Sequence, residues 1–329
     1  MTGHNPVLFD TSAATANVGD EIIMESVRQE LEQTVKSEFW VRLSTHDYMG
    51  SIGRRWVRNA NICIVGGTNL LASQYWKFRQ WKITPLDALF LRGKVVLMGV
   101  GWWQYQGRPD ILTRLLYRII LSHEAGVFHS VRDKYTLNKL RSIGITNVLN
   151  TCCPTMWRLD EEHCHKIPTM RGKGVVMTLT DYNKNPDLDR VLFQELSTRY
   201  TEVIVWPQGS GDRDYMMALG LPNVIDPGLV ALDQVLSKPN IDYVGTRLHA
   251  GIRALRHGCR SLILAVDNRA TEISKDTGLW VVPREDVPAL VNALDAEKEI
   301  KIRLPFAIIQ KWKSSIAAFI LRRGDTALP

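Results

Sequence analysis

An arginine and a histidine stand where a strand gives way to a helix in the second half of the chain. Residues 242–258, DYVGTRLHAGIRALRHG, predict a short apolar strand ending at Gly245 and a helix beginning near Leu248. Arg247 and His249 thus fall at the strand's carboxyl end and in the first helical turn, where free backbone N–H groups attract a phosphate or carboxylate. Arg247 can hold such an anion through two hydrogen bonds, and His249 can exchange a proton near neutral pH. The pattern predicts an anion site with a titratable neighbour, unless Arg247 caps carbonyls and His249 is a satisfied interfacial histidine.

A second arginine follows the next predicted strand. Arg269 comes after residues 261–264, so its loop should lie beside the loop of Arg247, and the two guanidinium groups could share one anion. The alternative is a surface arginine that pairs with Asp267 or Glu272.

The first half of the chain offers a third cation and a carboxylate. Arg132 directly precedes Asp133, a natural N-cap for the helix that follows, and is a candidate anion clamp from the other domain. Asn17 and Asp20 occupy the loop after the first predicted strand. Asp20 can cap its helix or take a proton from a substrate hydroxyl group.

Two loops of the first half suit a ligand that is approached closely. Gly66 and Gly67, followed by Thr68, come after the third predicted strand and let the backbone approach a ligand. The next strand is followed by GWWQYQGR, in which Trp102 and Trp103 offer aromatic faces that suit sugar rings. The alternative is that these tryptophans fill the core.

The elements that position these residues follow an alternation of short apolar runs with amphipathic stretches, typical of a parallel sheet covered by helices. Strands are predicted near residues 6–9, 39–43, 60–65, 94–100, 126–129, 175–179, 203–206, 224–225, 243–244, 261–264 and 280–282. Helices are predicted from near Asp20, Asp110 and Asp133, and over residues 188–199, 213–219, 229–237, 248–257 and 287–294. The polar stretch at residues 161–173 predicts the domain boundary. We therefore expect an α/β fold of two doubly wound, Rossmann-like domains, residues 1–165 and 166–329, facing across a cleft.

Composition narrows the partners. With 41 basic and 34 acidic residues the net charge is +7, which favours a phosphorylated substrate, a nucleic acid or an acidic membrane surface. The basic residues are scattered without a recognition motif, so nucleic acid is the weakest option. Five irregularly spaced cysteines without a CxxC pair indicate neither disulfides nor a metal site. With no signal peptide and no spanning segment in view, we expect a cytoplasmic protein.

Two basic amphipathic stretches bear on membrane association. Residues 114–121, RLLYRIIL, and 308–323, IIQKWKSSIAAFILRR, could lie on an acidic bilayer with their aliphatic residues down. The alternative is that both are core-facing helices with solvated basic edges.

Taken in order along the chain, the segments resemble the polysaccharide pyruvyl transferase family over roughly residues 6–290. The resemblance is carried by NxGDxxI at Asn17–Ile23, GGTNLL at residues 66–71, the G-x-G of Gly99 and Gly101, SVRD at 130–133, RLHA at 247–250 and the A-x-D-x-[KR] loop ending at Arg269. Two departures stand out. The family commonly has lysine at the position of Arg269, and an aspartate-proline pair where this chain has Cys153 and Pro154.

The resemblance implies a GT-B-like transferase that uses phosphoenolpyruvate to form a cyclic pyruvate ketal on a saccharide, with no cofactor and no metal. The implied catalytic residues are His249, as general acid, and Asp20. The implied phosphoenolpyruvate contacts are Arg247, Leu248, Arg269 and Arg132, and the implied acceptor contacts are Asn17, Gly66, Gly67, Thr68, Trp102 and Trp103. Family acceptors are often lipid-linked, which implies a location at the cytoplasmic face of the membrane.

Two other functions stay open from the sequence. A nucleotide-sugar glycosyltransferase or sugar epimerase can share this two-domain shape, and Glu272 could then contact a ribose. A family member that has lost catalysis and only binds saccharide is the third reading, which the two departures allow.

Overall fold

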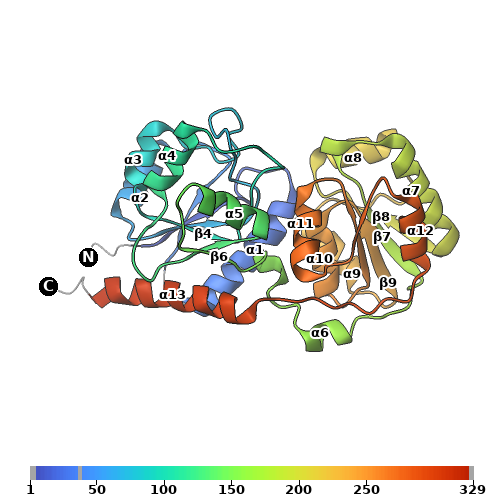
Figure 1. Cartoon of the computed structure of the whole chain (residues 1–329). Coiled ribbons are helices and arrows are strands. Elements are labelled where there is room, and N and C mark those ends of the chain that lie inside the picture. The colour runs from blue at the N-terminus through green and yellow to red at the C-terminus, as the bar shows by residue number, and fades with distance from the viewer. Residues whose placement is uncertain (1–4, 36–38, 326–329) are drawn as a thin grey trace. The chain divides into compact units, whose positions relative to one another are not determined.

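The chain forms two compact units, seen in a computed structural model that describes residues 5–35 and 39–325 (Figure 1). Unit 1 comprises Met1–Thr15, Ile23–Trp157 and Pro305–Pro329, and unit 2 comprises Ala16–Ile22 and Arg158–Leu304. This division differs from the expected one at residues 165 and 166. A short segment near the amino end belongs to unit 2, and the carboxy-terminal helix, expected with the second domain, belongs to unit 1.

Unit 1 is built on parallel strands. Its strands are β1 (Val7–Asp10), β2 (Val41–Ser44), β3 (Cys63–Gly66), β4 (Val95–Met98), β5 (His129–Val131) and β6 (Val148–Asn150). They form a sheet in the order β2-β1-β3-β4 and a separate pair β5-β6, with all pairings parallel. Every residue of β1, β3 and β4 is buried, as expected for strands covered by helices on both faces.

The helices of unit 1 cover these strands. They are the greater part of α1 (Val18–Thr34), α2 (Gly50–Asn59), α3 (Pro85–Leu91), α4 (Ile111–Ile120), α5 (Lys134–Ser142), the 3₁₀ turn η1 (Pro154–Met156) and α13 (Phe306–Asp325). Asp110 and Asp133 accept hydrogen bonds from Thr113 and Thr136 backbone N–H groups, so both expected N-caps are confirmed.

Unit 2 holds a five-stranded parallel sheet in the order β11-β10-β9-β7-β8. The strands are β7 (Gly174–Thr178), β8 (Glu202–Val205), β9 (Ile241–Gly245), β10 (Ser261–Ala265) and β11 (Val281–Pro283). Its helices are α6 (Glu161–His165), the 3₁₀ turn η2 (Asp181–Asn183), α7 (Pro186–Arg199), α8 (Ser210–Ala218), α9 (Leu229–Leu236), α10 (Leu248–Arg256), α11 (Asn268–Thr277) and α12 (Val287–Asp295). The chain order reverses between β7 and β9, which makes the sheet doubly wound.

Most predicted elements lie within a few residues of the observed ones. The prediction missed α2, α3, α11 and β6, which have short or mixed patterns. It also placed a strand at residues 224–225, where only an isolated bridge between Val224 and Val205 forms. The polar stretch at 161–173, expected as a linker, begins with the short helix α6.

The carboxy-terminal helix α13 settles one of the two membrane alternatives. Ile309, Trp312, Ile316 and Phe319 repeat at helical spacing and are at most 4% exposed. The Trp312 ring packs edge-on against Trp157, with ring centroids 5.8 Å apart. The core-facing interpretation of residues 308–323 is therefore confirmed up to residue 322, beyond which the side chains lie outside the described part. Among residues 5–35 and 39–325, no helix combines the length and apolar character that crossing a bilayer requires.

Candidate active site

The candidate residues of unit 2 gather where the strand order reverses. The loops after β7 and β9 diverge at this point, which opens the crevice that ligands use in doubly wound sheets. Gly245 ends β9 against β7, and a Cβ atom there would lie 2.6 Å from the carbonyl oxygen of Thr178. Glycine at 245 thus lets the β9 loop begin directly beside the β7 loop.

Arg247 follows this close contact and faces two carboxylates. Its Nε donates to Asp212 Oδ2 at 2.8 Å and its Nη2 donates to Asp181 Oδ1 at 3.0 Å, while Nη2 also bonds Asp212 Oδ1. Nε lies 3.3 Å from the Leu179 carbonyl oxygen as well, so the alternative that Arg247 caps a carbonyl holds in part. The side chain of Arg247 is 6% exposed, and that of Asp212 is fully buried.

The two carboxylates that bind Arg247 differ in burial. Burial raises the pKa of Asp212, and the charge and hydrogen bonds of Arg247 oppose that rise. Asp181 has a side chain 36% exposed, so it can leave the guanidinium at little cost. An incoming anion can therefore take the place of Asp181 on Nη2 while Asp212 keeps Arg247 in position.

His249 lies in the first turn of α10, two residues after Arg247. It is 4% exposed, and the neighbouring Leu248 is 5% exposed. The first turn of a helix presents backbone N–H groups that have no intrahelical acceptor. His249 is therefore held at a helix N-terminus suited to an anion, with little surface open to water.

Arg269 lies near the start of α11, after the adjacent strand β10. Asp267 caps this helix, and Arg269 Nε donates to Asp267 Oδ2 at 2.8 Å, which is the surface pairing considered as the alternative. Burial alone would raise the pKa of Asp267, but the charge and hydrogen bonds of Arg269 lower it to about 2. Arg269 is thus paired and still 20% exposed.

Tyr182, which the sequence analysis missed, joins the two arginines. It lies in η2, and the guanidinium groups of Arg247 and Arg269 stand over its ring at 5.1 and 5.4 Å from the centroid. Its hydroxyl donates to Asp267 Oδ2 at 3.1 Å and accepts from Arg269 Nη2. The structure therefore brings Arg247 and Arg269 to one aromatic ring. The available signal was an aromatic residue directly after a predicted strand, but only the strand order marks that loop as the switch point.

The Asn17–Asp20 motif lies with unit 2, not with the first domain as expected. Asn17 forms an antiparallel bridge with Gly209, and Asn17 Oδ1 accepts from Gln208 Nε2 at 3.0 Å. Gly19 leaves room for this amide, since a Cβ atom at residue 19 would lie 2.9 Å from the Gln208 carboxamide carbon. Burial lowers the pKa of Arg269, but Tyr182 and Asp267 raise it, and the charge of Asp20 adds a smaller rise.

Gln208 adds an unsatisfied acceptor to the same loop. The residue is 4% exposed, and its Oε1 has no hydrogen-bond partner among the described residues. A buried acceptor without a donor costs roughly 1–3 kcal/mol. A ligand that brings an O–H or N–H group to this loop would remove that cost.

Arg132 is held by loops of unit 1. Its Nη2 donates to Asn69 and its Nε lies 3.3 Å from Asp133 Oδ2, and the side chain is 1% exposed. Nη1 is buried without a hydrogen-bond partner in the described part of the chain. Cys153, at the position where the resembling family commonly has aspartate, is buried nearby. Burial raises the pKa of its thiol, and the hydrogen bonds of Thr155 and the charge of Arg132 oppose the rise.

Of the residues expected to contact the acceptor in the two loops of unit 1, some keep part of their surface exposed and Trp102 does not. Gly67 and Thr68 both have left-handed backbone, with φ of 56° and 52°, after the fully buried Gly66 at the end of β3. Trp102 is 0% exposed in the core, so it offers no face to a sugar. Trp103 is half-buried and packs on Phe78, with ring centroids 4.6 Å apart.

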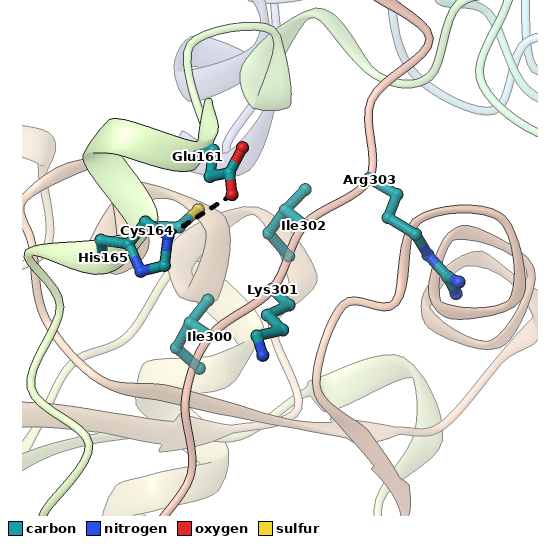
Figure 2. Close-up of a pocket in the computed structure, with 7 residues that line it drawn as sticks. All are labelled: Glu161, Cys164, His165, Ile300, Lys301, Ile302 and Arg303. Atoms are coloured by element: carbon teal, nitrogen blue, oxygen red, sulfur yellow. Dashed lines mark ion pairs between the residues drawn. The ribbon is translucent and has the colours of Figure 1, made fainter.

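A separate hollow of about 260 Å³ in unit 2 lies at the opposite edge of the sheet (Figure 2). It is lined by Glu161, Cys164, His165, Ile300, Lys301, Ile302 and Arg303. The helix α6 is tied to the last turn of α10 through His163, whose Nε2 lies 2.7 Å from the Leu255 carbonyl oxygen. Because α10 starts at the carboxyl edge of the sheet and runs back, this hollow lies at the amino edge, away from the arginine cluster. In the described part of the chain, no group of three or more His, Cys, Asp or Glu side chains is arranged to hold a metal ion.

Comparisons with known proteins give a family and a fold. Residues 17–268, more than half of the chain, match the model of the polysaccharide pyruvyl transferase family. The UDP-GlcNAc 2-epimerase of Methanocaldococcus jannaschii, solved in complex with UDP-GlcNAc and UDP, is similar over 97% of this chain and 99% of that one. Its TM-score is 0.56 and its sequence identity is 11%. The UDP-GlcNAc 2-epimerase of Neisseria meningitidis, bound to UDP-GlcNAc, covers 96% and 99% at a TM-score of 0.48 and 14% identity. No curated protein sequence matches the chain. The expected GT-B-like α/β fold of Rossmann-like units is confirmed.

Proposed function

Because the chain belongs to the polysaccharide pyruvyl transferase family, we propose that it moves the pyruvate unit of phosphoenolpyruvate onto two hydroxyl groups of a saccharide. The product is a cyclic ketal, and phosphate is released. The observation that carries the proposal is the cluster of Arg247, Arg269 and Tyr182 beside the helical turn that holds His249. Two cations and a helix N-terminus suit a donor with a phosphate and a carboxylate, and the histidine suits the proton that the reaction needs.

The reaction begins with a proton on carbon. His249 gives a proton to the methylene carbon of the donor, so the adjacent carbon becomes an oxocarbenium-like electrophile. One saccharide hydroxyl adds to that carbon and loses its proton, and Asp20 is the proposed base. Asp20 passes that proton to the phosphate oxygen, so the C–O bond breaks and hydrogen phosphate leaves. The second hydroxyl then adds to the oxocarbenium carbon and returns a proton to His249. The atoms and charges balance without a cofactor or a metal.

The arginines hold the donor by exchange of anions. Arg247 and Arg269 are already paired with Asp181, Asp212 and Asp267, so a free positive charge is not waiting in the site. Phosphate or carboxylate oxygens replace the partly exposed Asp181 on Arg247, and the N–H groups at the start of α10, including that of Leu248, complete the contact. Arg132 is also proposed to contact phosphoenolpyruvate.

The acceptor is proposed to be a polysaccharide precursor, in line with the family, and to be lipid-linked. Its proposed contacts are Asn17, Gly66, Gly67, Thr68 and Trp103, and the unsatisfied Gln208 beside Asn17 is a further candidate. These groups offer amides, open backbone and an aromatic face, which suit hydroxyl-rich rings.

Donor binding separates this proposal from its rivals. Phosphoenolpyruvate at about 100 times its Kd should stabilise the folded chain by about 2.7 kcal/mol, which a thermal-shift measurement detects. UDP-GlcNAc should have no such effect. Stabilisation by the nucleotide sugar alone would favour a glycosyltransferase or an epimerase. Stabilisation by phosphoenolpyruvate without phosphate release on adding saccharide would favour a member that only binds.

Tyr182→Phe should weaken donor binding without slowing the chemical step. The change keeps the ring beneath both guanidinium groups and removes the hydroxyl that joins Arg269 to Asp267. Loss of a hydrogen bond of this kind corresponds to about a 2- to 10-fold rise in KM for phosphoenolpyruvate at unchanged kcat. Tyr48→Phe is the matched control, because Tyr48 also accepts from an arginine, Arg79 Nη1 at 3.2 Å, but in unit 1. Equal effects of the two changes would remove Tyr182 from the site.

A further inference from the structure

Two neighbouring helices of unit 1 expose an apolar face. On α4, Ile111, Leu112 and Leu115 are 77%, 62% and 55% exposed, and on α3, Leu86 and Leu89 are 48% and 67% exposed. The two helices lie side by side (Figure 1). A surface residue of this kind is ordinary when alone, but five on adjoining helices mark an interaction surface. We call these five residues the α3–α4 face.

The face is hollowed and almost wholly apolar. A groove of about 450 Å³ runs between the helices, with Leu89, Leu112 and Leu115 in its lining. Arg79 is the one charged residue of that lining, and its guanidinium lies over Trp76, 5.7 Å from the ring centroid. The other side of α4, with Leu116, Tyr117 and Ile120, fills the core. Core packing therefore accounts for only one side of this helix.

The charges in the stretch that carries the face are mostly positive. Residues 76–119 contain eight lysines and arginines and two aspartates. One aspartate, Asp87, is fully buried and paired with Arg54, and the other, Asp110, caps α4. The exposed cations in this stretch are Lys77, Arg79, Arg92, Arg108 and Arg118. A group of apolar side chains surrounded by cations is complementary to a surface that has anionic groups outside and apolar groups beneath them.

We propose that the α3–α4 face binds the surface of an anionic lipid bilayer. Leucine and isoleucine side chains enter the boundary below the headgroups, and the arginines contact the anionic headgroups. The helix α13, whose apolar side is buried, does not contribute in this way. In the other basic stretch, residues 114–121, the core-facing alternative holds for Leu116, Tyr117, Ile120 and Leu121, which are buried. Only Leu115 of that stretch belongs to the α3–α4 face.

If the proposed function holds, the position of the face suits a lipid-linked acceptor. Trp76 and Arg79 line the groove, and Phe78 between them packs on Trp103 of the proposed acceptor loop. The face and the proposed acceptor loop are thus joined through one aromatic contact within unit 1.

Vesicle flotation tests the proposal on the full chain. The chain should float with vesicles that contain phosphatidylglycerol and stay in solution with phosphatidylcholine vesicles. Leu89→Ser, Leu112→Ser and Leu115→Ser combined should lower the partition coefficient at least 10-fold, because each side chain loses apolar burial. Each of Arg79→Gln and Arg118→Gln should lower it about 5-fold, and added salt should act in the same direction.

The controls separate membrane binding from folding and from catalysis. Val230 and Leu321 lie outside the α3–α4 face and are 71% and 69% exposed. Val230→Ser and Leu321→Ser should therefore leave flotation unchanged. Phosphate release with a water-soluble acceptor should be equal in the triple variant and the parent chain, so a failed flotation leaves the transfer reaction untouched. Absence of flotation with both vesicles, or equal flotation of the triple variant, overturns the proposal. So does a dimer in solution that the triple variant dissociates, since the face would then bind a second copy.

Discussion

His249→Gln is expected to lower the rate of phosphate release about 10²- to 10⁴-fold, the usual contribution of a positioned general acid. Glutamine keeps a polar side chain of similar size at this buried position, but it cannot deliver a proton to carbon. Turnover of phosphoenolpyruvate and acceptor at saturating concentrations measures the loss.

Binding distinguishes a lost acid from a damaged site. The variant should still be stabilised by phosphoenolpyruvate in a thermal-shift measurement, because the arginines and the helix N-terminus are unchanged. His257→Gln is the matched control. This histidine stands at the other end of the same helix, where its Nε2 lies 3.2 Å from Asp233, and its loss should leave turnover within about 2-fold. Equal turnover of His249→Gln and the parent chain would remove His249 from the mechanism.

Arg247→Met should destabilise unit 2 by about 3–5 kcal/mol, more than any other single change considered, because it leaves Asp212 buried without its cation. Urea unfolding at pH 7 measures the loss. Asp212→Asn in the same chain should recover part of it, since the uncompensated charge is then gone. Lys166→Met, which breaks an exposed pair with Glu162, should leave the urea midpoint unchanged.

The loss of unfolding free energy in Arg247→Met, relative to the parent chain, should also become smaller at acid pH. Burial raises the pKa of Asp212 in the folded chain, and loss of Arg247 raises it further, so the folded variant binds a proton that the unfolded chain releases at neutral pH. A group with a raised folded pKa adds stability below its unfolded pKa and loses it as pH rises. The difference between variant and parent should therefore fall as pH drops from 7 toward 4. A deficit that stays constant over this range would mean that Asp212 does not carry the effect.

The sequence was sufficient for most of the elements and for the ends of most strands, although α2, α3, α11 and β6 were missed. Runs such as VVMT and DYVG are short, apolar and bounded by polar residues, so strand ends and helix starts could be placed within a few residues. That is why Arg247 and His249 were expected at a strand end and a helix start, where they lie.

The sequence could not give the order of the strands or the partners across them. Tyr182 matters because β7 and β9 are neighbours at the point of reversal, and nothing in the local pattern of residues 179–183 encodes that neighbour. Asp212 lies far along the chain from Arg247, so their pairing was equally hidden. The Asn17 motif follows a strand of unit 1 yet bonds Gln208 of unit 2, which a reading by sequence proximity assigns to the wrong unit.

The guanidinium of Arg132 couples ligand binding in unit 1 to the free energy of unfolding of that unit. One of its nitrogens is buried without an acceptor among the described residues, which costs the folded unit roughly 1–3 kcal/mol. Any occupant that offers an oxygen at that nitrogen lifts the penalty for as long as it is bound. The melting temperature of unit 1 should then rise with the fraction of chains that have such a ligand bound.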